Sequence, residues 1–361
     1  MSGRIVILAA LLSALAANPG AAAADESVSI FDAAEISWDR ATPDPATRNG
    51  LVVLDGGQML EREASLPPAP VNQRDARRIV AVVEIEPILI EDEGKVRPGD
   101  PWTRLGAFSI LTVDPKTGQQ TEVELVRFIT GFGGPGVFEQ DVTALAPLLH
   151  GKQLFRGRIT TWRSPGWRIS AQLRYEVGGA GFRRPVIAQP LFHNPMVTAR
   201  EPVLKAEFTM PPASAGQRLE TPRIRVLSTG HATDGTGGDE FITRTHVLRV
   251  DGRVVAMWRP WSEHGGALRD QNPTSGRREI DGRELWSSDL DRSGWAPGMA
   301  VEPTIIPLPE LAAPGSHTIE LEIRGIRPKD ESGQGYWRIS AVLVADEPWP
   351  VEKDAAAAQG R

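Results

Sequence analysis

The stretch Asp289-Leu-Asp-Arg-Ser-Gly-Trp-Ala-Pro-Gly-Met-Ala-Val301 decides how this sequence is interpreted, together with the upstream run Ser228-Thr-Gly-His-Ala-Thr-Asp-Gly-Thr-Gly-Gly-Asp-Glu-Phe-Ile-Thr-Arg-Thr-His246. Charged, aromatic and hydroxyl residues mix with glycine and proline in both runs, without the period of a strand or a helix. Ordered loops on a rigid sheet are where binding and catalysis are usually found. We therefore expect two loops at a functional site or, in the simpler alternative, two surface loops that pack on each other.

The sequence around these loops favours many short strands. The chain holds 36 glycines and 30 prolines and shows no long helical period. Asp251-Gly252 separates His246–Val250 from Arg253–Trp258, and Asp-Gly fits a two-residue hairpin turn, which needs positive φ angles. Each half of the chain holds roughly eight such strands, which predicts an all-β protein of two tandem antiparallel sandwiches, jelly rolls or an immunoglobulin-like topology.

The boundaries of these halves follow from composition. The first long β-branched run begins at Arg78, and a stretch rich in glycine and proline separates the two halves. We expect a signal peptide at 1–24, an extension with the first strands at 25–77, a first jelly roll at 78–185, a second at 186–347 and a flexible tail at 348–361.

The N-terminus has the pattern of a secretory signal. Arg4 precedes the apolar run Ile5–Ala16, and Ala21–Ala24 supplies small residues for cleavage near Ala24. The apolar run is too short to span a bilayer comfortably. We therefore expect a secreted or periplasmic mature protein.

Composition excludes several kinds of chemistry and partner. The chain has no cysteine, which rules out disulfides, thiol catalysis and thiolate metal sites. Its formal net charge is -6, and no basic block stands out, so we expect neither nucleic acid nor a membrane as partner. We expect a monomer.

Two motifs resemble the C-terminal domain of the peptide-N-glycosidase F family. They are Arg244-Thr-His246 and Asp291-Arg-Ser-Gly-Trp-Ala-Pro-Gly-Met-Ala-Val301, where that family reads Asp-Arg-Ala-Gly-Trp-Cys-Pro-Gly-Met-Ala-Val. Weaker agreement in the first half involves Arg127–Thr130, Asp141–Thr143 and Thr161-Trp162, so the resemblance covers roughly 78–345. It implies two eight-stranded jelly rolls side by side with a cleft between them. It also implies cleavage of the amide that links asparagine to the first sugar of an N-glycan, without metal or organic cofactor.

The same double jelly roll occurs in a superfamily with copper-dependent monooxygenases that hydroxylate peptidylglycine. Those enzymes need histidines at paired spacing. The six histidines here, at 150, 193, 231, 246, 264 and 317, form no His-x-His pair. We therefore expect no copper and no other metal.

The resemblance assigns catalytic positions to Glu240, Arg292, Thr103 and Thr160. The family carries carboxylates where this chain has the two threonines. A threonine hydroxyl hardly ionises at neutral pH and cannot serve as a carboxylate base. The resemblance thus implies a hydrolase-like protein that acts on N-linked glycans or glycopeptides, with its usual catalytic aspartate replaced by Thr103. The alternative is a non-catalytic glycan-binding module on the same fold.

The resemblance also implies substrate-binding roles for a second set of side chains. Aromatic faces stack on sugar rings, and an arginine fork pairs with carboxylate or amide oxygens. Trp295 and His246 have a simpler interpretation as buried structural residues, and Glu240 and Arg292 as a bracing ion pair. The set is Trp102, Arg104, Trp162, Arg244, His246 and Trp295.

Three carboxylates could replace the missing base. Asp100 lies in a Gly-Asp-Pro setting typical of a turn, and Asp291 lies inside the motif. Trp38-Asp-Arg40 repeats the family's lost Trp-Asp-Arg tripeptide, but it lies far upstream, and we interpret it as coincidence. A diverged glycoamidase, a glycan-binding module and an enzyme for another amide or glycoconjugate all remain open.

Overall fold

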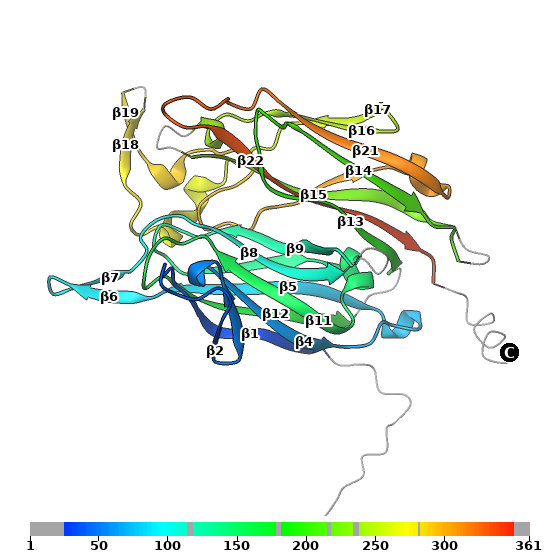
Figure 1. The fold of residues 1–361 in the computed structure, drawn as a ribbon, viewed down its shortest axis with the longest axis horizontal. Helices are drawn as coiled ribbons and strands as arrows, with labels where there is room; N and C mark the ends of the chain where they lie inside the picture. The colour runs from blue at the N-terminus through cyan, green and yellow to red at the C-terminus, as the bar shows by residue number, and fades with distance from the viewer. Residues whose placement is uncertain are drawn as a thin grey trace, which may run out of the picture.

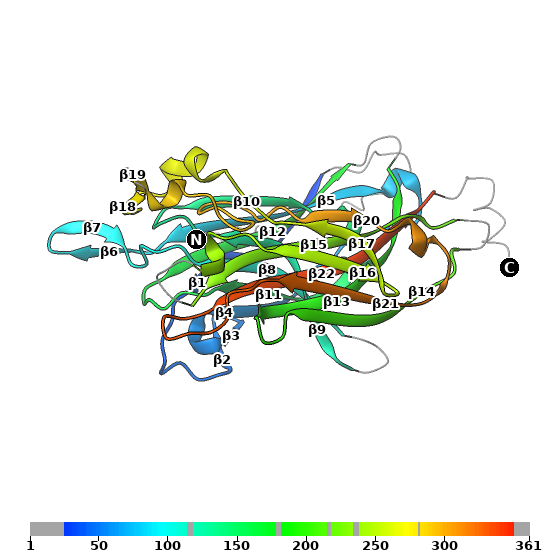
Figure 2. The same cartoon turned by 90° about the horizontal axis from the view of Figure 1, so that it is seen from above.

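The computed structural model describes residues 25–113, 118–177, 182–214, 218–233, 238–280 and 282–349. The expected signal peptide at 1–24 and residues 350–361 of the expected tail lie outside them. Figure 1 shows two β-sandwiches side by side, and Figure 2 shows their strands running along the same long axis. The expected all-β fold of two tandem antiparallel sandwiches is confirmed.

The first sandwich faces two antiparallel sheets across one core. One sheet has the order β1 (Glu26–Ile36), β12 (Trp167–Val177), β5 (Arg77–Pro87), β10 (Gly136–Asp141). The other has the order β2 (Ala46–Arg48), β3 (Leu51–Leu54), β4 (Met59–Leu66), β11 (Gly151–Ile159), β8 (Leu105–Val113), β9 (Gln120–Ile129). Phe31, Phe108 and Phe155 meet between them. Each sheet thus has four long strands, and the short β2 and β3 extend the second.

The first sandwich begins at Glu26, and the expected start at Arg78 is wrong. β1 pairs with β12 in antiparallel register from Glu26 to Ile36, and β4 pairs with β11. The first strands expected within 25–77 are present, but residues 26–66 complete both sheets of the sandwich and form no separate extension. The bounds of these strands were not predicted because two register shifts interrupt β1. They break its alternation of buried and exposed residues.

The second sandwich has two four-stranded antiparallel sheets. Their orders are β13 (Arg184–Val197), β22 (Gly335–Glu347), β15 (Glu220–Ala232), β20 (Thr304–Pro307) and β14 (Val203–Met210), β21 (Gly315–Arg324), β16 (Thr245–Val250), β17 (Arg253–Trp258). The predicted hairpin is β16–β17, and its turn residues Asp251 and Gly252 have φ angles of 49° and 77°. Asp-Gly tolerates this left-handed conformation at both positions.

Short elements decorate the loops. Two hairpins stand apart from the sandwiches: β6 (Leu89–Asp92) with β7 (Lys95–Pro98), and β18 (Arg277–Ile280) with β19 (Arg283–Trp286). The described helices are single 3₁₀ segments: η1 (Asp55–Gly57), η2 (Gln73–Asp75), η3 (Thr143–Leu148), η4 (Gly238–Glu240), η5 (Gly265–Gln271), η6 (Ser287–Asp289) and η7 (Pro309–Ala312). Within these ranges, no helix has the length and apolar character that crossing a membrane requires.

The two sandwiches join through a buried face. Val342 and Val344 of β22 pack into the first core, and Arg127 Nη1 of β9 donates to the Arg338 carbonyl at 2.8 Å. A smaller apolar cluster of Ile129, Leu227, Trp295 and Val301, with Leu105 against it, lies at one end of this face. The domain junction is therefore packed, and the loops that meet at that end form the candidate site.

Candidate functional site

The stretch 289–301 is an ordered joint between the two domains. The Val301 amide donates to the Arg127 carbonyl at 2.8 Å, and the Ile129 amide donates to the Met299 carbonyl at 3.1 Å. The Gly298 amide returns a bond to the Ile129 carbonyl at 3.0 Å, with a φ of 89° that favours glycine. A loop of the second domain thus lies along the end of β9.

Glu240 and Arg292, two predicted catalytic residues, form an ion pair in this joint. Arg292 Nε donates to Glu240 Oε1 at 2.9 Å, while its Nη atoms donate to the carbonyls of Leu290 and Ser287, both at 2.8 Å. The side chain of Arg292 is 1% exposed and that of Glu240 is 24% exposed. Burial lowers the pKa of Arg292, and Glu240 opposes this shift. Arg292 is therefore fully engaged, and Glu240 is the member that solvent or a ligand can reach.

Trp295 lies below this pair and is not available for stacking on a ligand. Its Nε1 donates to the Gly230 carbonyl at 2.8 Å, and it is 4% exposed. The Arg292 guanidinium lies 4.8 Å from its ring centroid, within cation–π range. Because Trp295 shares an apolar cluster with Ile129 of the first domain, and Leu105 packs against that cluster, it connects the ion pair to the opposite sandwich.

Arg244 and His246 have structural partners in the second domain. Arg244 Nε donates to Asp239 Oδ1 at 2.6 Å, and Asp239, which is 0% exposed, also accepts from Trp337 Nε1 at 3.2 Å. His246 is 0% exposed, with Nε2 2.8 Å from Ser228 Oγ. Burial lowers the pKa of His246 to about 4, so it is neutral at pH 7. The structure does not bring His246 to a surface that a substrate can contact.

On the first domain, Asp100 is a buried cross-link. It is 0% exposed, and it accepts from Arg104 Nε at 2.7 Å and from Arg104 Nη2 at 3.0 Å. Thr161 Oγ1 donates to it at 2.6 Å. This network ties the loop 100–104 to the loop 160–163. Arg104 is thereby committed to Asp100, and Asp100 has no free edge to act as a base.

Two of the tryptophans predicted to bind substrate lie on the loops of the Asp100 network and are exposed to solvent. Trp102 and Trp162 are 54% and 60% exposed, one on each of the loops that Asp100 joins. Trp261 of the second domain, 39% exposed, precedes Ser262, whose amide donates to the Arg292 carbonyl at 2.8 Å. Exposed indole rings near an ion pair suit the apolar faces of sugars. Trp261 carried no motif in the sequence and was missed.

The two threonines lie beside these loops. Thr160 Oγ1 donates to the Leu105 carbonyl at 3.2 Å, and the Thr160 amide donates to the same carbonyl at 2.9 Å. Thr103 is half-buried, and its hydroxyl makes no hydrogen bond within the described part of the chain. Contacts run from Thr160 through Leu105 and Trp295 to Arg292. The first-domain positions and Glu240 thus belong to one junction.

Trp38 and Asp39 also reach this region, contrary to the argument from sequence distance. The Trp38 amide donates to the Arg163 carbonyl at 2.9 Å, and its ring meets that of Trp162 edge to face at 5.7 Å. The cause is the β1–β12 pairing, which places Ile36 opposite Trp167. Asp39 is exposed, and its Oδ1 accepts from the Ala41 amide at 2.8 Å. The pairing of β1 with β12 is the information from which the position of Trp38 and Asp39 could have been predicted.

The described residues hold no group of three or more His, Cys, Asp or Glu side chains placed to bind a metal ion. His231 illustrates why the histidines do not gather. It is stacked between Trp295 and Tyr336, at 5.5 and 5.2 Å, and burial lowers its pKa to about 3. It is a packed, neutral core residue.

Comparisons with known proteins agree with this geometry. The family model described as Peptide-N-glycosidase F, C terminal, matches residues 194–344. The chain is 23% identical over 289 residues to peptide-N(4)-(N-acetyl-beta-D-glucosaminyl)asparagine amidase F of Elizabethkingia miricola, covering 75% of this chain and 77% of that relative.

Solved structures share the fold. A structure of PNGF-II superposes with a TM-score of 0.73 at 21% identity and covers 90% of this chain. This chain spans only 65% of the length of PNGF-II. PNGase F, described as a glycosylasparaginase from Flavobacterium meningosepticum, superposes with a TM-score of 0.66 at 17% identity, covering 89% of this chain and 96% of that one.

Proposed function

We propose, from the premise that this chain belongs to the peptide-N-glycosidase F family, that its domain junction binds N-linked glycans or glycopeptides. The observation that carries the proposal is the Glu240–Arg292 pair, partly open to solvent, at a domain junction whose first-domain loops carry exposed Trp102 and Trp162 and whose second-domain loop carries exposed Trp261. The pair supplies a polar anchor for amide or hydroxyl groups, and the rings supply stacking surfaces.

The geometry favours binding over hydrolysis in the family's usual form. Amide hydrolysis needs a base or water-positioning group and a donor to the developing oxyanion. Thr103 and Thr160 provide no carboxylate, and Asp100 is committed to Arg104 and Thr161. Glu240 is then the one carboxylate of the predicted catalytic set.

A second candidate function is amide hydrolysis with Asp39 in the role of the missing carboxylate. The specific observation is that Asp39 is exposed and follows Trp38, whose ring touches Trp162. Asp39 would activate water while Glu240 and Arg292 orient the substrate. The relative's name, an asparagine amidase, describes this reaction for that protein.

The decisive experiment is to incubate an N-glycopeptide with the purified mature protein and to follow the peptide by mass spectrometry, with binding measured calorimetrically in parallel. Binding without conversion of asparagine to aspartate supports the module. Trp102→Ala or Trp162→Ala should weaken binding about tenfold, as expected for loss of a stacking contact. Val137→Ala, on the exposed face of β10, is the matched control. Absence of binding by the wild type refutes the proposal.

The same assay separates the second candidate. Conversion that is lost in both Asp39→Asn and Glu240→Gln supports a rearranged amidase. Conversion that appears only in Thr103→Asp supports a binding site that has lost its catalytic carboxylate. Conversion unaffected by Asp39→Asn contradicts the role of Asp39.

We further propose that the protein acts outside the cytoplasm as a monomer, after cleavage near Ala24. The N-terminal pattern of a basic residue, an apolar run and small residues supports export. The intact mass of protein recovered from a secreting host tests the cleavage site, and sedimentation equilibrium tests the oligomeric state.

A further inference from the structure

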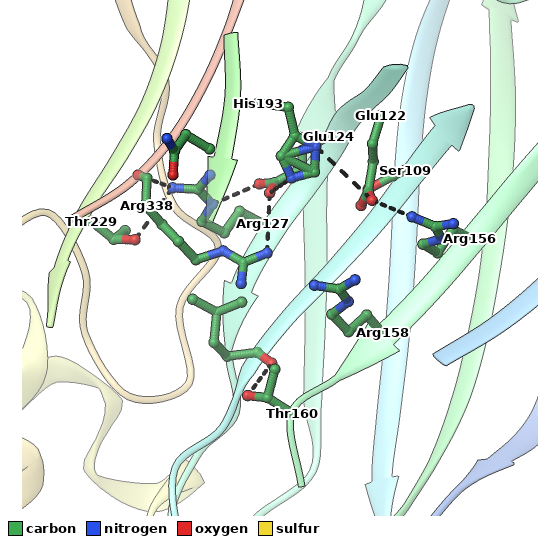
Figure 3. Close-up of polar contacts among 12 residues, drawn as sticks. Ser109, Glu122, Glu124, Arg127, Arg156, Arg158, Thr160, His193, Thr229 and Arg338 are labelled. Atoms are coloured by element: carbon green, nitrogen blue, oxygen red, sulfur yellow. Dashed lines mark hydrogen bonds and ion pairs between the residues drawn. The ribbon is translucent and has the colours of Figure 1, made fainter. Parts of the chain in front are cut away.

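A cluster of three arginines lies in the buried face between the sandwiches. We use the term arginine cluster for Arg127, Arg158 and Arg338. Arg158 of β11 and Arg127 of β9 both stand opposite Ala107 of the intervening β8, so they belong to one row across the sheet. Because Ala107 is small, the row leaves room above its centre. Figure 3 shows the Arg338 guanidinium, from β22 of the second domain, lying between Arg127 and Arg158.

The cluster contains buried donors without partners. Arg127 and Arg338 are 1% and 6% exposed. Four buried nitrogen atoms of the cluster have no hydrogen-bond acceptor in the described part of the chain: Arg127 Nη2, Arg158 Nε, Arg338 Nε and Arg338 Nη2. Native proteins pair nearly all such groups with protein or water, and a buried charged donor left unpaired is costly. Something other than the protein therefore completes these donors.

The charges around these donors indicate which kind of acceptor would complete them. Glu124 pairs with Arg127 at 2.6 Å and lies 3.6 Å from Arg338 Nη2, so the two arginines share one carboxylate. Burial opposes ionisation of Glu124, but Arg127 and Arg338 lower its pKa to about 2. Arg158 has no carboxylate within ion-pair distance among the described residues, and its Nη2 donates to Met59 Sδ at 3.7 Å.

The neighbouring groups reduce this imbalance without removing it. Arg156 pairs with Glu122 at 2.6 Å and also with Glu61, which leaves one extra negative charge beside the cluster. Burial lowers the pKa of His193, against the effect of Glu124 and Glu122, so His193 adds no negative charge and little positive charge. Four guanidinium groups, those of Arg127, Arg156, Arg158 and Arg338, thus share three carboxylates, and buried Arg225, which donates to the carbonyls of Glu124 and Leu125, adds a further positive charge. Neutral water would satisfy the donors without balancing that excess positive charge.

We propose that Arg158 and Arg338 bind an oxyanion, a carboxylate, sulfate or phosphate group, between the two sandwiches. Guanidinium N–H groups bind such groups in forked geometry, and the anion supplies both the acceptors and the charge that the cluster lacks. A groove of about 430 Å³ reaches the Arg158 side of the cluster: Arg156, Arg158 and Glu122 line it from the first domain, and Leu191, His193 and Pro195 from the second.

The position of Arg158 links this site to the junction described above. Arg156, Arg158 and Thr160 succeed one another at alternate positions, and Figure 3 shows Thr160 near the cluster. The anion can therefore be a free inorganic ion that joins the domains or an acidic substituent of a saccharide. The proposal does not depend on the glycan-binding function.

Thermal unfolding of the full mature protein in sodium sulfate, against sodium chloride of equal ionic strength, tests the proposal. Sulfate stabilises proteins generally through exclusion from their surfaces, so variants are required. Arg158→Met and Arg338→Met remove the proposed ligands. Arg174→Met, at a surface ion pair with Glu139 and Glu176, is the matched control.

The wild type and Arg174→Met should gain about 5 °C more in Tm than the two site variants at a sulfate concentration 100 times Kd. In chloride alone, Arg158→Met should have a Tm equal to or above that of the wild type, because it removes a half-buried charge that pairs with no carboxylate among the described residues. An equal sulfate response in the wild type and Arg158→Met overturns the proposal, as does a Tm in chloride lower than that of the wild type.

Probe ligands distinguish the two sources of the anion. If sialyllactose raises Tm at lower concentrations than sulfate or phosphate, and lactose does not, the site takes an acidic sugar substituent. If the inorganic ions act and sialyllactose does not, the site takes a free ion. Both outcomes support an oxyanion site, provided that Arg158→Met abolishes the response.

Discussion

The Glu240–Arg292 pair should be strongly asymmetric when its members are replaced one at a time. Arg292→Met keeps an unbranched apolar side chain but removes the guanidinium contacts with Trp295 and Phe241 and three hydrogen bonds, two of them to the carbonyls of Leu290 and Ser287. Each buried acceptor left unpaired costs ~1–3 kcal/mol, so we expect a loss of ~4 kcal/mol in the free energy of unfolding. Glu240→Gln retains an acceptor for Arg292 at a partly exposed position and should cost ~1 kcal/mol.

Urea unfolding followed by tryptophan fluorescence measures both values. The matched control is Arg174→Met, a surface arginine whose ion pairs should contribute little. If Glu240→Gln destabilises as much as Arg292→Met, the reasoning is refuted, because the carbonyl contacts of Arg292 would then contribute nothing. If neither replacement changes the free energy of unfolding, Arg292 does not stabilise the joint.

Three further predictions follow from buried groups and close contacts. Stability should fall as the pH drops from 6.5 toward 4, because the unfolded chain binds protons on His246 and His231 that the folded state refuses until about pH 4 and about pH 3; His246→Gln should reduce the slope of the urea midpoints over that range and leave the part due to His231, and an unchanged slope would contradict it. Asp100→Asn should cost ~3 kcal/mol and weaken glycopeptide binding through the loop of Trp102; a loss of stability with unchanged affinity would show that Asp100 does not position Trp102. Gly131→Ala places a Cβ 2.0 Å from the Gln271 carbonyl across the domain junction, so limited proteolysis should become faster there, whereas Gly276→Ala, with open space around it, should match the wild type.

Sequence patterns predicted the architecture well where local chemistry decides it. The Asp251-Gly252 turn predicted one hairpin, and the motif at 291–301 predicted the similarity to the peptide-N-glycosidase F C-terminal family model, which matches residues 194–344. The start of the first domain was wrong, because the bulges of β1 interrupt its alternation. Pairing between β1 and β12 joins residues more than a hundred positions apart, and such non-local contacts leave little trace in one sequence.

The candidate site was predicted only in part, again because it depends on contacts between residues far apart in the sequence. The motif located Glu240 and Arg292, which the structure joins at 2.9 Å. Residue type alone did not separate exposed Trp102 and Trp162 from buried Trp295, because an indole suits both a core and a ligand surface. The arginine cluster was not predicted from the sequence, because it depends on the register of β11, β8 and β9 and on a residue from β22.

The bonds between the stretch 289–301 and the end of β9 have a consequence for solubility. β9 is the last strand of its sheet, and an uncovered edge strand offers free amides and carbonyls to another chain. Val301, Met299 and Gly298 pair with the backbone of Arg127 and Ile129 there, and Phe128 bridges Ala300. The stretch 289–301 thus also covers the end of an edge strand and keeps its amides and carbonyls from pairing with another chain.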